Sequence, residues 1–154
     1  MEFSIATHND IDQLVKMRML YLKEHFKEIT EVQKKSIEEQ LPKYFAKHLG
    51  KDMIAFVAKE NNEIISTAFL IIIEKPANLN FMTGIIGEVL NVYTCNEYRR
   101  QGIARHLMEM LMEEAEERRL DFLELKATKD GYPLYKKLGF NEMQPSGVLM
   151  KYMI

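Results

Sequence analysis

Three of the chain's six arginines lie in the segment YRRQGIAR, residues 98–105, on either side of Gly102. The segment follows an apolar, β-branched run and precedes an amphipathic stretch, so it marks a turn from a strand into a helix. A helix N-terminus presents unpaired N–H groups and the positive end of the helix dipole, and a glycine there lets the backbone approach a ligand closely. Arg99, Arg100 and Arg105 can add charge-assisted hydrogen bonds. The turn is therefore predicted to bind an anion of the phosphate type.

Two strands and a helix must position this turn. The patterns predict a strand over residues 88–94, a helix over 102–119 and a second strand over 121–127. Such a unit has parallel strands joined by a right-handed crossover, which places the turn and the helix N-terminus at one edge of the sheet. The spacing excludes two familiar phosphate loops, because neither G-x-x-x-x-G-K-S/T nor G-x-G-x-x-G occurs.

The pattern that does occur is R/Q-x-x-G-x-G/A, filled by Arg99, Gly102 and Ala104. A second segment, YPLYKKLGF at 132–140, fits an L-Y-x-K-x-G-F signature, filled by Leu134, Tyr135, Lys137, Gly139 and Phe140. With both signatures in register over residues 88–140, the chain resembles the GNAT superfamily of acyl-CoA N-acyltransferases.

The resemblance implies that the glycine turn binds the pyrophosphate of coenzyme A, with acetyl-CoA as co-substrate and no metal. Backbone groups of the preceding strand would pair with the pantetheine arm as an added strand does. The implied cofactor contacts are Val92, Tyr93, Thr94, Arg99, Arg100, Gln101, Gly102, Ile103, Ala104, Arg105 and Thr128. The chain departs from the family at Thr128, often an asparagine, and at Gly131, usually an alanine. A hydroxyl would therefore replace an amide at the first of these positions.

Acetyl transfer to an amine needs a neutral amine, a polarised thioester carbonyl and a proton for the departing thiolate. The resemblance implies direct attack by the amine and makes Tyr135 a candidate general acid, the alternative being a core aromatic. An ordinary tyrosine pKa of about 10 keeps the hydroxyl protonated at neutral pH. Glu88 is a candidate general base, acting directly or through water. The alternative is an exposed glutamate at a strand end, with water as the base.

The rest of the chain predicts one α+β domain spanning residues 1–154. The resemblance implies a GNAT-type fold, in which helices flank a mixed, largely antiparallel central sheet that contains the parallel strand–helix–strand unit. The expected elements are a strand at 2–6, a helix at 10–26, a helical region at 30–48 interrupted at Pro42, two strands within 53–73, a loop at 77–87, a short helix at 131–139 and a last strand at 147–154.

Composition excludes several classes of protein. The formal net charge of the 154 residues is −2. The arginines are therefore expected to form one localised anion site, not an extended basic surface that binds nucleic acid. No apolar stretch approaches the roughly 20 residues that span a bilayer, and the N-terminus does not read as a signal peptide. The single cysteine, Cys95, excludes an internal disulfide and indicates a reducing, cytoplasmic location. Without a neighbouring histidine it reads as structural, and the histidines show no metal-ligand spacing.

The sequence predicts an acetyl-CoA-dependent N-acetyltransferase acting on a primary amine of a small molecule or peptide. The alternative is a non-catalytic acyl-CoA-binding regulatory module of the same fold. The acceptor pocket is expected between the first two helices and the 76–87 loop, with Arg18, Tyr21, Glu24 and His25 as lining residues on helical periodicity. The apolar last strand, 148–154, is expected to be an edge that pairs with a second subunit, giving a homodimer.

Overall fold

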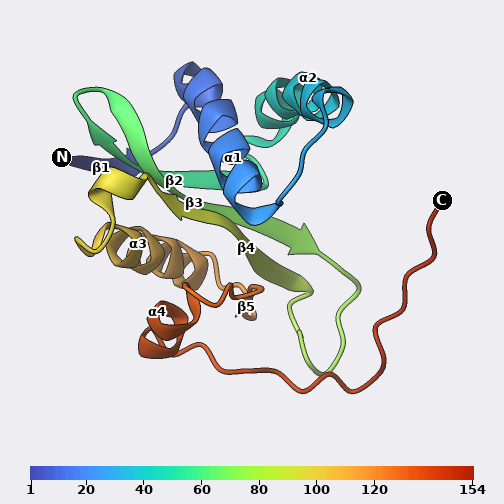
Figure 1. The fold of residues 1–154 in the computed structure, drawn as a ribbon. Coiled ribbons are helices and arrows are strands. Elements are labelled where there is room, and N and C mark those ends of the chain that lie inside the picture. Colours follow the sequence, from blue (N-terminus) through green and yellow to red (C-terminus); the bar gives the residue numbers. More distant parts are fainter.

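A five-stranded sheet in the order β1-β2-β3-β4-β5 forms the centre of the molecule (Figure 1). The computed structural model describes all residues from Met1 to Ile154. The strands are β1 Glu2–Ile5, β2 Met53–Glu60, β3 Glu63–Glu74, β4 Ile85–Thr94 and β5 Leu123–Glu124. Neighbours from β1 to β4 are antiparallel, whereas β4 and β5 are parallel. The predicted mixed, largely antiparallel sheet is confirmed.

Helices cover both faces of the sheet. The two N-terminal helices lie on one face, and the two helices that follow β4 in the chain lie on the other (Figure 1). They are α1 Ile11–His25, α2 Glu31–His48, α3 Ile103–Glu117 and α4 Tyr132–Lys137, with short 3₁₀ turns η1 His8–Asp10 and η2 Asn96–Tyr98. None of the helices is long and apolar enough to cross a membrane.

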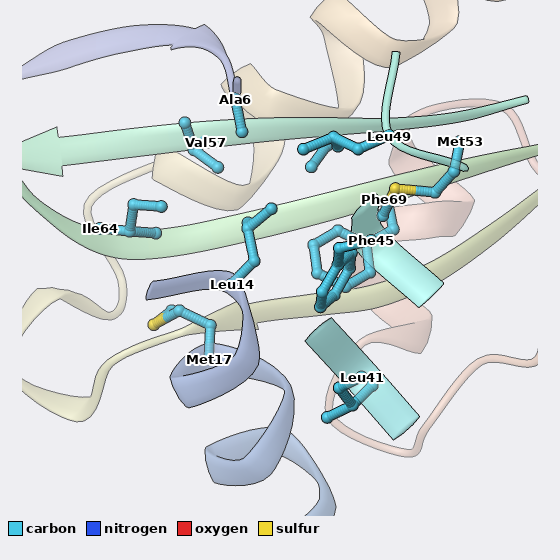
Figure 2. Close-up of a cluster of buried hydrophobic side chains, with 11 residues drawn as sticks. Ala6, Leu14, Met17, Leu41, Phe45, Leu49, Met53, Val57, Ile64 and Phe69 are labelled. Carbon is cyan, nitrogen blue, oxygen red and sulfur yellow. The ribbon is translucent and has the colours of Figure 1, made fainter. Parts of the chain in front are cut away.

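The alternation of β2 divides the core into two halves. Met53, Ala55 and Val57 face the cluster under α1 and α2, which Figure 2 shows with Leu14 and Phe45. Alternate residues of the same strand face the second cluster, under α3; they are Ile54, Phe56 and Ala58. Successive side chains of a strand point to opposite faces, so an almost unbroken apolar run in β2 fills both halves.

Helix α2 differs from the prediction at Pro42, where it continues without interruption. Proline lacks the N–H that would bond one turn back, yet buried Leu41 and Phe45 on either side hold both parts of the helix against the sheet. The N-terminus of α2 agrees with the predicted start of the helical region at residue 30. Gln33 N–H donates to Thr30 Oγ1 at 3.2 Å, and Thr30 N–H donates to Gln33 Oε1 at 3.0 Å, which is a capping box.

Three further differences concern the second half of the chain. Strand β4 begins at Ile85, so the predicted 77–87 loop is shorter than expected. The strand predicted over 121–127 is reduced to Leu123–Glu124. The last strand, predicted over 147–154, is wrong, because these residues form no strand and are all exposed. An apolar alternating pattern makes a segment able to pair, but a strand forms only where a partner edge lies beside it.

Candidate active site

A bulge in β4 opens the sheet beside β5. In the β3–β4 register Thr67 lies opposite Tyr93 and Phe69 lies opposite Leu90, so β4 carries an extra residue between these pairs. Parallel pairing with β5 covers only Gly87 and Glu88 of β4. Beyond Glu88 the two strands separate, and β4 has no partner on its β5 side. The backbone groups on that side are available to a ligand that lies along the strand.

Asn91 forms the bulge and is buried, with 2% of its surface exposed. Its φ of +50° lies in the left-handed region, which asparagine tolerates better than most residues. Its Nδ2 donates to Thr67 Oγ1 at 3.0 Å, and that hydroxyl donates to the Asn91 carbonyl at 2.9 Å. Arg18 Nη1, from α1, donates to Asn91 Oδ1 at 3.2 Å. Hydrogen bonds from β3 and α1 therefore hold the bulge.

Sequence reasoning did not include Asn91 in the site. The available signal was an asparagine inside an apolar strand, where this residue is disfavoured. The partner Arg18 was expected in the acceptor pocket, and it forms no ion pair within the chain. Its guanidinium lies 5.5 Å from the centroid of the Tyr21 ring, and burial lowers the pKa of the guanidinium.

The glycine turn lies where β4 gives way to α3. Arg100 and Gly102 have φ values of +61° and +78°, which turn the chain sharply before the helix begins at Ile103. The first helical N–H to find a backbone partner is that of His106, which bonds to Gly102 O at 3.1 Å. The N–H groups of the preceding residues therefore remain free. A Cβ at Gly102 would meet no atom within 4 Å, so the turn is open to a ligand.

The three arginines of the turn differ in their contacts. Arg99 Nε donates to Thr94 O at 2.8 Å, and its Nη2 donates to Glu24 Oε2 at 2.7 Å. Arg105 pairs with Glu109 one turn along α3, at 2.8 Å. Arg100 makes neither a side-chain hydrogen bond nor an ion pair. Gln101 Nε2 donates weakly to Glu97 O, at 3.4 Å.

The Arg99–Glu24 pair connects α1 with the end of β4. Its hydrogen bond to Glu24 is the main reason that the pKa of Arg99 is raised. The guanidinium also lies 5.4 Å from the centroid of the Tyr93 ring. Both partners are partly exposed, so the pair stabilises the fold by no more than about 1 kcal/mol. Its main effect is to position the turn relative to α1.

Most of the predicted site residues surround one cleft of about 740 Å³. The walls come from α1, β4, the glycine turn, α3 and the α4 region. The lining residues are Tyr21, Glu24, His25, Val92, Tyr93, Thr94, Tyr98, Arg99, Arg100, Gly102, Ile103, Ala104, Arg105, Thr128, Asp130, Gly131, Leu134, Tyr135 and Lys137. Of the predicted cofactor contacts, only Gln101 is not among them.

Tyr135 of α4 reaches this cleft and also packs in the core. Its ring meets Phe140 edge-on at a centroid distance of 5.9 Å. Burial, followed by the nearby Tyr21, raises the pKa of Tyr135 to about 12. The hydroxyl is therefore protonated throughout the physiological range. Tyr135 thus packs in the core and also lines the cleft, and its role as a general acid stays a prediction.

The two departures from the family pattern lie beside Tyr135. A Cβ at Gly131 would lie 2.9 Å from Tyr135 Cε2 and 3.2 Å from Thr128 Oγ1. The absence of a side chain at Gly131 therefore leaves room for the tyrosine ring. Thr128 Oγ1 accepts a hydrogen bond from Gly131 N–H at 3.1 Å. This bond fixes the start of α4 and leaves the hydroxyl hydrogen of Thr128 free to donate.

Glu88 does not line the cleft. It is half-buried in β4, paired with Ile71 on one side and with Glu124 of β5 on the other. Burial, and then the negative charges of Asp52 and Glu88, raise the pKa of Tyr44 in α2. Glu88 therefore lies toward the α1–α2 side of the sheet, and its neighbour Glu124 is a second carboxylate that sequence reasoning did not consider.

Cys95 follows β4 but shows no sign of an activated nucleophile. Burial is the main cause that raises the pKa of its thiol, which lowers the thiolate fraction. Its backbone N–H bonds to Ile65 O at 2.9 Å. The structure brings no three His, Cys, Asp or Glu side chains together in a way that could hold a metal ion.

Comparison with known proteins decides the family. The model of the acetyltransferase (GNAT) family matches residues 16–140. The chain belongs to the GNAT family. An N-alpha-acetyltransferase of Saccharolobus solfataricus is 28% identical over 147 residues, covering 90% of this chain and 79% of the relative. The predicted N-acetyltransferase class is thereby confirmed.

Solved structures agree with this GNAT assignment. A predicted acetyltransferase from Clostridium acetobutylicum, solved with acetyl-CoA, superimposes with a TM-score of 0.85 at 32% identity, covering 97% of this chain and 95% of the other. A GCN5-related N-acetyltransferase from Ralstonia eutropha JMP134 gives a TM-score of 0.81 at 21% identity, with 97% of each chain covered. The second likeness shows the fold alone.

The bulge residue provides a test of the site's architecture. Asn91→Ala removes the side-chain hydrogen bonds to Thr67 and Arg18. It also leaves a non-glycine residue with no polar side chain at φ +50°. We therefore expect a loss of about 2–4 kcal/mol in the free energy of unfolding. Asn91→Gly loses the same bonds but tolerates the φ value, and its loss should be smaller by about 1 kcal/mol. Urea denaturation measures both. Equal losses in the two variants would show that the left-handed backbone conformation contributes nothing to the loss of stability in Asn91→Ala.

Proposed function

We propose that this GNAT chain is an acetyl-CoA-dependent N-acetyltransferase that acetylates a primary amine of a small molecule or peptide by direct attack. The observation that carries the proposal is the course of the cleft. The unpaired edge of β4 leads directly to the free N–H groups of α3. An extended amide-containing arm fits the first, and a pyrophosphate fits the second.

The residues of the cleft fit coenzyme A in their chemistry. Val92, Tyr93 and Thr94 offer backbone groups along β4, and Gly102 leaves open space at the turn. Ile103, Ala104 and Arg105 supply helix N-terminal N–H groups. Arg100 is the one arginine of the glycine turn whose side chain has neither a hydrogen bond nor an ion pair within the chain, so we infer that its guanidinium binds phosphate oxygens. Arg99 contributes chiefly by positioning, because Thr94 and Glu24 already accept from two of the five N–H donors of its guanidinium.

The acetyl thioester supplies the reactive carbonyl when acetyl-CoA is bound. Free N–H groups of β4 near the bulge can stabilise negative charge that develops on the carbonyl oxygen. The Tyr135 hydroxyl, held in its protonated form, donates toward the sulfur as the C–S bond breaks. A phenol with a pKa of about 12 is a weaker acid than an ordinary tyrosine, so its main contribution is this hydrogen bond to the developing thiolate.

The amine must lose a proton when it forms the amide. We infer that Glu88, directly or through water, accepts this proton on the α1–α2 side of the sheet. Tyr21, Glu24 and His25 of α1 line the cleft, and Arg18 lies one turn earlier on the same helix. We therefore infer that the acceptor amine approaches from α1.

The single cysteine bears on the cellular location of the protein, and the exposed apolar residues near the C-terminus bear on its assembly. We propose a cytoplasmic enzyme, since Cys95 is the only cysteine and a reducing compartment keeps such a thiol free. We also propose a homodimer, for which the exposed apolar end of the chain is the support. A non-catalytic acyl-CoA-binding module remains the alternative function, and it predicts acetyl-CoA binding without thiol release for any amine.

The glycine turn is tested by a pair of matched variants. Asparagine and aspartate both tolerate a positive φ and have nearly the same shape, so Gly102→Asn and Gly102→Asp differ mainly in charge. We expect Gly102→Asp to bind acetyl-CoA at least about tenfold more weakly than Gly102→Asn, because the carboxylate would lie beside the pyrophosphate. The difference should shrink as salt is added. Calorimetry measures the affinities, and equal values would place the phosphates elsewhere.

Removing the Tyr135 hydroxyl tests the hydrogen bond to the leaving sulfur. Tyr135→Phe keeps the ring, so acetyl-CoA affinity should be unchanged while kcat falls by about 10²–10⁴-fold. Tyr132→Phe, in the same helix, is the control and should keep the wild-type rate. Because the pKa of Tyr135 is raised to about 12, the wild-type rate should show no loss from tyrosine ionisation below roughly pH 11. A Tyr135→Phe enzyme with the wild-type kcat would exclude the role.

The pH dependence of a second variant tests the base. At low pH the acceptor is mostly an ammonium ion, so Glu88→Gln should lower kcat most there and recover as free amine accumulates at high pH. The loss in Tyr135→Phe should not recover in this way. Glu124→Gln is the control for a neighbouring carboxylate. An unaltered pH–rate profile in Glu88→Gln would leave water as the base.

A further inference from the structure

Arg18 is a half-buried cation that leaves most of its hydrogen-bonding capacity unused. A guanidinium has five N–H donors, and within the chain only Nη1 of Arg18 donates, to Asn91 Oδ1 at 3.2 Å. No carboxylate of the chain pairs with it. An arginine that is partly removed from water usually pairs with a carboxylate or a phosphate, which match its planar fork. Arg18 therefore lacks the charged partner that its position favours.

The free nitrogens of Arg18 are open to a ligand. Every buried side-chain nitrogen or oxygen of the chain has a hydrogen-bond partner, whereas Nε and Nη2 of Arg18 have none, so these two nitrogens reach the molecular surface. They form one edge of the guanidinium, the geometry that binds two oxygens of one carboxylate in parallel. The guanidinium lies 5.5 Å from the centroid of the Tyr21 ring, and Tyr21 lines the cleft. The free edge therefore lies beside the active site.

Tyr44 adds a donor from a second helix. Helices α1 and α2 pack against each other on one face of the sheet (Figure 1). Burial raises the pKa of Tyr44, and the nearby positive charge of Arg18 opposes this shift, so the hydroxyl is protonated at neutral pH and lies near the guanidinium. This hydroxyl has no hydrogen-bond partner in the chain, and by the same argument it is not buried. Two helices therefore bring unpartnered donors to one place.

The carboxylate proposed as the base lies near the same phenol. Glu88 is one of the negative charges that raise the pKa of Tyr44, and Asp52 is the other. The Asp52 carboxylate is already bound, since its Oδ1 lies 2.8 Å from His48 Nδ1. Glu88 and Arg18 do not pair with each other, although both act on Tyr44. An acceptor with an amine and a carboxylate a few bonds apart could present one group to each.

We propose that Arg18, assisted by Tyr44, binds a carboxylate of the acceptor, so that the acceptor is an amine with a carboxylate close to it. The carboxylate belongs either to a free amino acid or to an acidic first residue of a peptide. A single guanidinium neutralises one carboxylate, whereas a phosphate dianion would leave a net negative charge beside Glu88. The inference rests on the proposed acetylation for the statement that the bound molecule is the acceptor.

Pools of matched acceptors measure whether the enzyme recognises this charge. A pool of the common amino acids is compared with a pool of their primary amides, and peptides that begin with aspartate or glutamate are compared with peptides that begin with asparagine or glutamine. Thiol release from acetyl-CoA measures the rate. In one of the two comparisons the carboxylate pool should react at least about tenfold faster, and that comparison identifies the source of the carboxylate. Equal or slower reaction of both carboxylate pools would overturn the proposal.

Variants assign the preference to Arg18. Arg18→Gln keeps a donor for Asn91 but loses the charge, so it should remove most of the preference, and Tyr44→Phe should reduce it by about fivefold. Lys16→Gln removes the same charge from an exposed position of α1 and should keep the wild-type preference. Each preference is a ratio within one preparation, so a partial loss of folded protein cancels. Equal losses in Lys16→Gln and Arg18→Gln would overturn the proposal, as would a wild-type preference in Arg18→Gln.

A binding measurement separates this inference from the proposed reaction. Coenzyme A carries no acetyl group, so protein saturated with it binds acceptors without turnover. The ¹⁵N signal of Arg18 Nε–H, identified by its loss in Arg18→Gln, should shift with the preferred carboxylate pool and stay in place with the matched neutral pool. This shift without thiol release would refute the acetylation and support the carboxylate site. Thiol release without the shift would refute the carboxylate site and leave the acetylation in place.

Discussion

The left-handed backbone of Asn91, in the middle of β4, is the constraint on which the site depends. A strand that continued in regular register would keep its backbone groups engaged on both sides. The extra residue bends β4 away from β5, as bulges generally do, and leaves one edge of β4 unpaired. Thr67 and Arg18 hold the bulge through the asparagine side chain, so the opening is built into the packed core and does not rest on a mobile loop.

The positive charge of the turn serves two purposes. Arg99 and Arg105 are occupied by Glu24 and Glu109, and they hold the turn and the first turn of α3 in place. Arg100 and the free N–H groups of α3 remain for an anion. A site of this design depends chiefly on backbone donors in a fixed arrangement, which lose little conformational freedom when a ligand binds. The proposed anion site is therefore compatible with the net negative charge of the chain.

The sequence predicted those parts of the molecule whose determinants are close together in the chain. The two strands predicted within residues 53–73 form as β2 and β3, and α3 lies within two residues of its predicted bounds. The part of the cleft formed by the glycine turn and α4 was found because two local signatures contain residues such as Arg99, Gly102 and Tyr135. By contrast, the bonds from Arg18 to Asn91 and from Arg99 to Glu24 join residues far apart in sequence, so no local pattern revealed them. The last strand failed for a related reason, since its apolar alternation carries no information about which edge it meets.

We propose that the free edge of β4 and the N-terminus of α3 form one binding surface for acetyl-CoA. A titration of ¹⁵N-labelled protein with acetyl-CoA, followed by backbone amide NMR, tests it most directly. We expect the largest shifts at Val92 to Thr94 and at Gly102 to Arg105, with β1 and β2 almost unaffected. Shifts centred on β5 and the end of α3, or no shift at either the β4 edge or the α3 N-terminus, would contradict it.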